Sequence, residues 1–135
     1  MREILFRGKR IDTGSWKEGY YLCLHSNEEN LHFIVDNDGE YHRVNPETIG
    51  EFTGLTDKNG KKIFEGDILK ISEGCDEDDY VIRKVYAYRG VLCVDYCTPD
   101  FDFNALAFLD NDTGYVFKTI GNIHDNPELI GGNYD

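Results

Sequence analysis

The sequence predicts a mainly antiparallel β-fold for this chain of 135 residues. Runs rich in valine, isoleucine, tyrosine and phenylalanine alternate with short clusters of glycine, asparagine and aspartate, a pattern typical of β-hairpins and not of long helices. Hydrophobic residues make up 40% of the chain and aromatic residues 13%, which is enough apolar material for a core without disulfide support. We therefore expect one compact unit of antiparallel strands with one or two short helical turns.

Residues 1–45 are expected to form an N-terminal β-meander subdomain. The turn between its last two strands is Asp36-Asn37-Asp38-Gly39, whose residues tolerate the positive φ of a tight hairpin. The strands are expected at residues 4–11, 16–24, 31–35 and 40–44.

Residues 46–135 predict a small, partly open β-barrel of the SH3-like or pseudo-barrel kind, on which the meander packs. Asn45, Pro46 and Gly50 suit the cap, first position and end of one helical turn, and Asn59-Gly60 is a strong hairpin signal. Residues 104–109 fit either a strand or a short helix, and Pro127 begins another turn. Strands are expected at residues 51–56, 62–64, 68–71, 80–88, 91–96 and 115–120.

Charge is high and unevenly distributed. The chain has 26 acidic and 14 basic residues, a net charge of −12, which disfavours direct binding of nucleic acid. Two segments are candidate interaction sites, one basic and one acidic: Arg2, Arg7, Lys9 and Arg10, and Asp76, Glu77, Asp78 and Asp79. If the first strand lies at a sheet edge, its unpaired backbone and basic side chains would dock another subunit, so we expect a homo-oligomer.

The cysteines and the hydropathy pattern predict a cytoplasmic protein. Four cysteines occur without an N-terminal apolar segment of the signal-peptide type, which favours reduced thiols. No window approaches the roughly eighteen apolar residues of a membrane span, so no membrane partner is expected.

No metal or cofactor is expected. The Asp36–Gly39 and Asn59-Gly60 loops lack the first ligand and the closing glutamate of an EF-hand in the matching register. Cys93 and Cys97 share one face of a predicted strand, but a zinc site needs two further ligands, so buried thiols are the simpler interpretation.

Two patterns invite other functions. Glu65 and Asp67 share a strand face and, with His124, would form the site of a hydrolase, although no nucleophile motif accompanies them. Tyr80, Tyr86 and Tyr88 fall on one face of a strand, and the acidic residues at 73–79 favour a protein interface or core over base stacking.

Three segments resemble the YopX family: residues 1–8, 53–68 and 120–129, in the family's order. The central segment, with the sequence Thr-Gly-Leu-Thr-Asp-Lys-Asn-Gly-Lys-Lys-Ile-Phe-Glu-Gly-Asp-Ile, is the most specific. The resemblance implies a β-rich protein with a small barrel-like body, encoded mainly by phages and prophages. The family has no established biochemical function, so no catalytic residue is transferred.

We therefore predict a non-enzymatic binding or assembly protein that acts in the cytoplasm during phage or prophage life. Its partners would be other copies of itself and, beyond these, a host or phage protein. One alternative is an acidic regulator or decoy that binds a basic, nucleic-acid-binding host protein. The other is the hydrolase built on Glu65 and Asp67.

Overall fold

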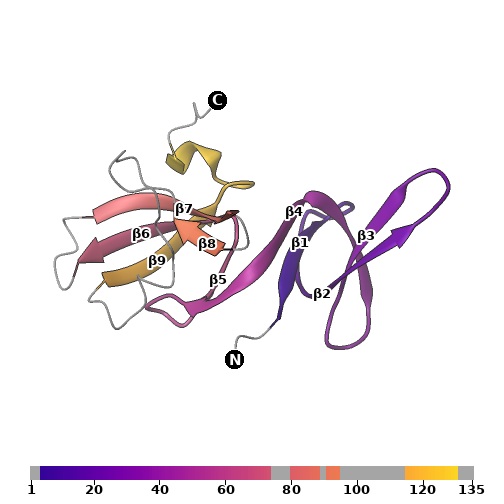
Figure 1. Ribbon diagram of the computed structural model, residues 1–135, viewed down its shortest axis with the longest axis horizontal. Coiled ribbons are helices and arrows are strands. Elements are labelled where there is room, and N and C mark those ends of the chain that lie inside the picture. The colour runs from indigo at the N-terminus through magenta and orange to yellow at the C-terminus, as the bar shows by residue number, and fades with distance from the viewer. Residues whose placement is uncertain (1–3, 74–79, 89–90, 95–114, 131–135) are drawn as a thin grey trace. The chain divides into compact units, whose positions relative to one another are not determined.

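The computed structural model describes residues 4–73, 80–88, 91–94 and 115–130, and these residues confirm the mainly antiparallel β-fold (Figure 1). The described strands are β1 (Phe6–Arg10), β2 (Trp16–His25), β3 (Asn30–Val35), β4 (Tyr41–Thr56), β5 (Lys62–Phe64), β6 (Asp67–Glu73), β7 (Tyr80–Tyr88), β8 (Val91–Val94) and β9 (Tyr115–Asn122). The predicted turn after Asn126 is the 3-10 helix η3 (Pro127–Ile130). None of the helices in the described part of the chain is long and apolar enough to cross a membrane.

The chain divides into two units, residues 1–54 and 55–135. Residue 45, after which the sequence places the boundary between its subdomains, lies inside β4, which runs from Tyr41 to Thr56. The last two residues of β4 belong to the second unit, where β4 and β5 form the hairpin around Asn59-Gly60.

The helical turn expected at residues 45–50 is wrong, because these residues are part of β4. Asn45 does form a local cap, since its Oδ1 accepts the N–H of Glu47 at 3.1 Å. However, β4 pairs with β1, and Lys9 donates its N–H to the hydroxyl of Thr48 at 2.8 Å. The register shifts between Arg7 and Lys9, an irregularity of the kind that accommodates a proline without an N–H in a strand.

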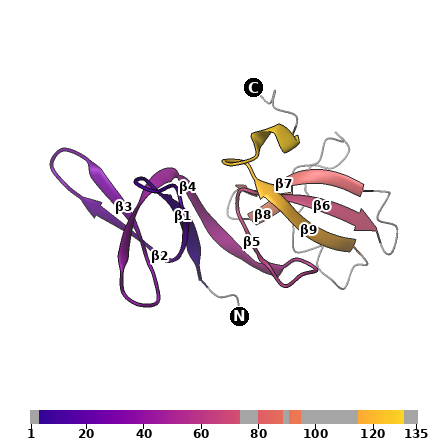
Figure 2. The same cartoon turned by 180° about the vertical axis from the view of Figure 1, so that it is seen from behind.

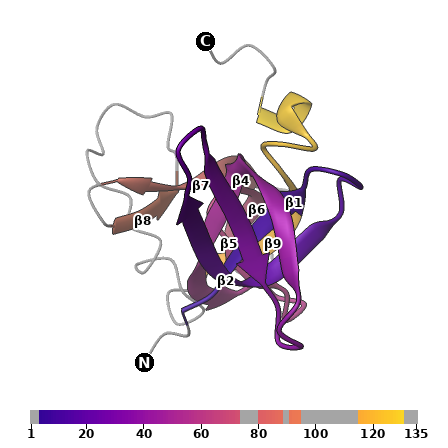
Figure 3. The same ribbon diagram turned by 90° about the vertical axis from the view of Figure 1, so that its right-hand side faces the viewer.

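In the first unit the predicted meander is present and closes on itself. Strands β1 to β4 pair in sequence order, and β1 also pairs with β4, so the four strands surround a common interior (Figures 2 and 3). Ile34, Val44 and Phe52 are buried in this unit. Gly8 packs closely on Val44, because a Cβ on Gly8 would lie 3.0 Å from that side chain.

Ring closure gives β1 partners on both sides. Phe6 pairs with Gly19 of β2 and with Glu51 of β4. The first strand is therefore not an edge strand. The docking of another subunit at this strand was predicted only for an edge strand, so that condition is not met.

The second unit contains an open antiparallel sheet with the order β8-β7-β6-β9. One face of this sheet contributes Leu69, Ile71, Val85 and Phe117 to a core cluster, which Ile63 of β5 completes and against which Leu55 packs. Two backbone hydrogen bonds hold the Gly66 turn in place: Gly66 donates to the carbonyl of Val85 at 2.8 Å and accepts from Ile123 at 2.9 Å. Residues 53–68 and 120–129, two of the segments that resemble the YopX family, thus contact each other in the folded unit.

Replacing Gly60 with valine is expected to lower the free energy of unfolding by about 1–2 kcal/mol, because Gly60 has a φ of 81° that a β-branched residue resists. A Cβ at Gly60 would meet nothing within 4 Å, so conformation and not crowding causes the loss. Urea denaturation measures the effect. Gly60→Asn is the control, because asparagine tolerates this conformation and should lose less. An unchanged stability in the valine variant would contradict the prediction.

Candidate functional site

The described residues of the basic segment predicted to bind a partner contact other side chains of the first unit. The guanidinium of Arg7 lies 4.7 Å from the centre of the Trp16 ring, and Arg7 is only 8% exposed. Lys9 also approaches Trp16, at 6.0 Å. Arg10 forms a 2.6 Å ion pair with Asp12. These cations stabilise the ring of strands through cation–π and hydrogen-bond contacts.

Several other predicted residues lie outside the described part of the chain. They are Arg2, the acidic residues Asp76, Glu77, Asp78 and Asp79, the cysteines Cys75 and Cys97, and residues 104–109. The strand that carries Cys93 is described, but its side chain is not, and the same holds for Tyr88. Tyr80 is 47% exposed and Tyr86 is half-buried.

The candidate hydrolase residues do not form an open carboxylate pair. Asp67 is only 1% exposed, and its Oδ2 accepts the N–H of Phe64 at 2.8 Å. This bond caps the turn at Glu65 and Gly66. The His124 segment reaches the same turn through the backbone, but the N–H of His124 donates to the side chain of Asn122 at 3.0 Å. The arrangement explains Asp67 as a structural group of the turn.

Asp36, Glu40 and His42 are the described residues whose ligand atoms approach one another closely enough to hold a metal, within 4.8 Å. The predicted hairpin turn here is confirmed, because Gly39 has a φ of 81° and donates to the carbonyl of Asp36 at 3.0 Å. The hydrogen bond from His42 is the largest cause that keeps the pKa of Asp36 below its ordinary value, and the bond from the N–H of Glu40 adds to it.

The hydrogen bonds of this trio oppose metal binding. Arg10 Nη1 lies 3.3 Å from His42 Nδ1, and a guanidinium only donates, so Nδ1 accepts. The ring proton then sits on Nε2, which donates to Asp36 Oδ2 at 2.7 Å. The nitrogen that faces the carboxylates is therefore occupied by a proton, and a cation would also lie beside a guanidinium. The trio links the β3–β4 turn to Arg10, and a structural role explains it better than metal binding does.

A face of apolar side chains covers the outside of the first unit. Residues paired across strands share a face, and the register aligns Tyr20 with Val35 and Val35 with Tyr41. Side chains two residues apart on a strand point to the same side, so the pairs Leu22 with Phe33 and Leu24 with Leu31 share this face. The outer apolar face consists of Tyr20, Leu22, Leu24, Leu31, Phe33, Val35 and Tyr41.

This outer apolar face is accessible. Tyr20, Tyr41 and Leu24 are 65%, 61% and 45% exposed, and the other members are half-buried. Phe33 and Tyr41 meet edge to face with ring centres 6.0 Å apart, which fixes two of the aromatic side chains. The opposite side of the same strands carries the buried Ile34 and His42. The sheet therefore has apolar material on both sides, and the outer side faces solvent.

The β2–β3 hairpin extends this face beyond its neighbours (Figure 1). Strand β1 pairs with β2 only as far as Gly19, and β4 pairs with β3 only at Phe33–Val35. The rows of Leu24 with Leu31 and of His25 with Asn30 lie past both of these contacts. In the described part of the chain, the hairpin tip is thus a two-stranded ribbon without a further strand at either edge.

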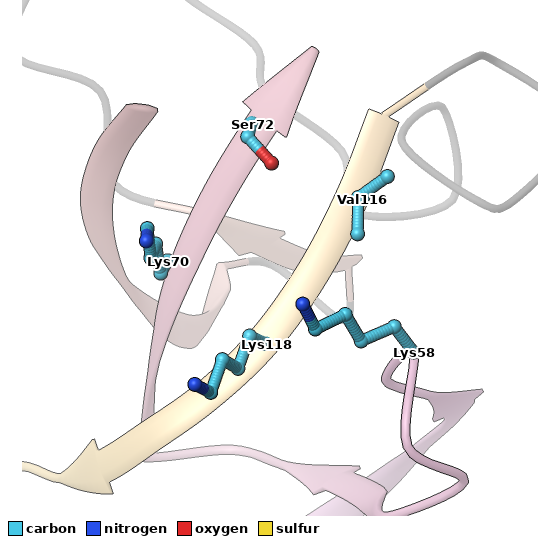
Figure 4. Close-up of a pocket in the computed structure, with 5 residues that line it drawn as sticks. All are labelled: Lys58, Lys70, Ser72, Val116 and Lys118. Carbon is cyan, nitrogen blue, oxygen red and sulfur yellow. The ribbon is translucent and has the colours of Figure 1, made fainter. Parts of the chain in front are cut away.

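A group of lysines lines a small hollow in the second unit (Figure 4). Lys70 of β6 and Lys118 of β9 are directly paired, and Ser72 pairs with Val116 in the adjacent row. Lys58 extends from the turn after β4 toward β9, held by the bond from its N–H to the carbonyl of Phe117 at 2.9 Å. The hollow has a volume of about 40 Å³. The sequence alone does not reveal this group, because its members come together only through strand pairing.

The structure defines a class of small all-β protein, with a closed ring of four strands in one unit and an open antiparallel sheet in the other. The chain belongs to the YopX family, because the family model described as YopX protein matches residues 5–131. This confirms the resemblance seen in the sequence.

One solved structure extends the comparison. The crystal structure of protein EF1440 from Enterococcus faecalis is similar to this chain, with 25% sequence identity and a TM-score of 0.55. The alignment covers 96% of this chain and 99% of that chain. No protein with a curated description matches the sequence.

Proposed function

We propose that this protein is a non-enzymatic assembly protein of the cytoplasm that self-associates through the outer apolar face. The observation that carries the proposal is the exposure of Tyr20, Leu24 and Tyr41 on one continuous sheet face. Contiguous exposed apolar patches are uncommon on monomeric proteins and often mark interfaces. Each square ångström of this face that is buried would contribute about 25 cal/mol.

A second copy of the chain fits this face better than a charged partner. Sheets pack face to face through apolar side chains, and a two-fold axis brings identical patches together. The charged group in these rows is Arg43, and it pairs with Glu29 at 3.3 Å. An apolar surface whose charge is internally paired avoids close repulsion between copies of a chain with a net charge of −12.

Salt separates this proposal from the acidic regulator. Two copies with a charge of −12 repel each other at long range, and salt screens that repulsion. Association through the apolar face should therefore persist or strengthen as salt is added. Binding of a basic partner by surface carboxylates would weaken instead.

Light scattering on the intact protein across a salt series is the test, with Leu24→Lys as the disrupting variant. We expect an oligomer for the intact protein and at least about tenfold weaker association for Leu24→Lys, since a charge would have to be buried in the interface. Ile11→Lys is the matched control, because Ile11 is 58% exposed in the same unit, lies outside the face and undergoes the same charge change. It should associate normally.

A point variant is preferable to removal of residues 1–10, because such a deletion would take β1 out of the ring. A strictly monomeric intact protein at every salt and protein concentration would refute self-association and leave the acidic regulator as the leading function. Equal loss of association in Leu24→Lys and Ile11→Lys would show that added charge, and not this face, is responsible.

A further inference from the structure

We propose that Lys58, Lys70, Lys118 and Ser72 form a binding site for a phosphoryl group, the dianion of a small phosphate monoester or of free phosphate. The site lies on the sheet of the second unit and is separate from the outer apolar face. The observation behind it is that lysines from three segments, far apart in the sequence, line one hollow (Figure 4).

The backbone fixes the positions of the three lysines. Lys70 and Lys118 are neighbours in the β6–β9 ladder, where directly paired residues have their Cβ atoms about 5 Å apart. Lys58 is tied to β9 by its backbone bond to Phe117. The Nζ of Lys70 lies 4.4 Å from the centre of the Tyr80 ring, which belongs to β7, on the side of β6 away from β9. The three lysines are therefore placed by two strands and a turn of the same unit.

Electrostatics favours an anion at this position. Like charges on directly paired cross-strand positions destabilise a sheet, and Lys70 and Lys118 are such a pair. Residues 55–135 contain sixteen acidic and eight basic residues, so three lysines at one hollow are not a consequence of composition. A bound dianion would convert this repulsion into attraction.

The chemistry of the lining matches a phosphoryl group. Each lysine offers three N–H donors, and the hydroxyl of Ser72, a residue only 6% exposed, lines the same hollow. Lysine binds phosphate as a point charge, and a dianion with several oxygens can accept from several lysines at once. A volume of about 40 Å³ admits one such group, while the rest of a ligand would extend into solvent.

Titration of the intact protein with inorganic phosphate and with O-phosphoserine, at constant ionic strength, tests the site by amide chemical shifts. We expect saturable shifts at Ser72, Lys70 and Lys118 with a dissociation constant on the order of 1 mM. Serine without the phosphate should cause none. Binding of O-phosphoserine should strengthen as pH rises through about 6, where its phosphate gains the second charge.

Inorganic phosphate and O-phosphoserine distinguish the two sources of the group. Tighter binding of the ester would identify a phosphate monoester as the ligand, and equal binding would identify free phosphate. Both results support a phosphoryl site.

Lys118→Gln should weaken binding by about tenfold, which is about 1.4 kcal/mol. The matched control is Lys61→Gln, because Lys61 is an exposed lysine of the 57–61 turn that does not line the hollow. The control should bind like the intact protein.

Three results would overturn the proposal: no saturable shifts in a folded protein, equal weakening by Lys118→Gln and Lys61→Gln, or affinity that does not change between pH 5 and pH 7. The last would show that a single negative charge suffices. Because the outer apolar face is in the other unit, the oligomeric state of Lys118→Gln should be unchanged, so failure of this site is distinguishable from failure of self-association.

Discussion

Replacement of Asp57 with alanine is expected to lower the free energy of unfolding by about 3 kcal/mol or more. The side chain is only 5% exposed, and its carboxylate accepts three backbone N–H groups. Oδ1 accepts from Asn59 and Lys61, both at 2.9 Å, and Oδ2 accepts from Thr119 at 3.0 Å. Alanine would leave all three donors without this acceptor and would release the 57–61 turn from β9.

The pH dependence of stability provides a second measurement on Asp57. Burial acts to raise its pKa, but the hydrogen bonds from Thr119, Lys61 and Asn59 prevail, and the pKa lies below its ordinary value of 3.8. A carboxylate with a depressed pKa contributes stability that is present above 3.8 and is lost as pH falls through the lower folded value. Urea denaturation between neutral pH and pH 3 should show this loss.

Asp57→Asn is the control for charge. Its carbonyl oxygen can still accept from Asn59 and Lys61, whereas its NH₂ group would face the Thr119 N–H, so its stability should lie between that of the intact protein and the alanine variant. The asparagine variant should also lose less stability in acid, since it has no carboxyl to protonate. An alanine variant as stable as the intact protein would show that Asp57 does not hold the turn.

Replacement of Gly19 with alanine is expected to destabilise the first unit by about 3 kcal/mol or more, at or beyond the upper end of typical overpacking. A Cβ at Gly19 would lie 2.0 Å from the carbonyl oxygen of Val35 and 2.7 Å from its carbon. The obstructing atoms are backbone atoms of β3, so the hairpin would have to separate to admit the methyl group. Chemical denaturation and amide exchange in β2 and β3 would measure the loss.

Gly39→Ala is the matched control for Gly19→Ala. Gly39 also lies in the first unit and has a φ of 81°, but a Cβ there would meet nothing within 4 Å. Its loss should be limited to the cost of the backbone conformation, about 1 kcal/mol. Equal stability of the two variants would mean that β2 and β3 separate easily at Gly19.

Most strands were predictable because their limits depend on local chemistry. The turn residues around Gly39 and Gly60 adopt positive φ, and the strand expected at residues 80–88 is β7. The failure at residues 45–50 has the opposite origin. Asn45 and Pro46 are favourable for a helical turn locally, but pairing with β1, more than thirty residues earlier, decides the conformation. Ring closure was missed for the same reason.

The candidate surfaces were less predictable than the fold. The alternating apolar residues of β2 and β3 are visible in the sequence, but Tyr21, Cys23 and Ile34 on the other side hide which face is outward. The lysines at the hollow depend on the β6–β9 register. The basic segment shows the limit of charge counting, since Arg7 proved to be buried against Trp16.

The ring cannot close between β1 and β4 until β4 has been synthesised. Phe6 pairs with Glu51, so the ribosome must add a further 45 residues before the first strand finds its second partner. At typical rates of translation this takes about 2–9 s. During that interval β1 is a temporary sheet edge in the nascent chain, exposed to pairing with other chains. The positive charges of Arg7, Lys9 and Arg10 would then repel identical nascent strands, before the same side chains take up their contacts in the folded ring.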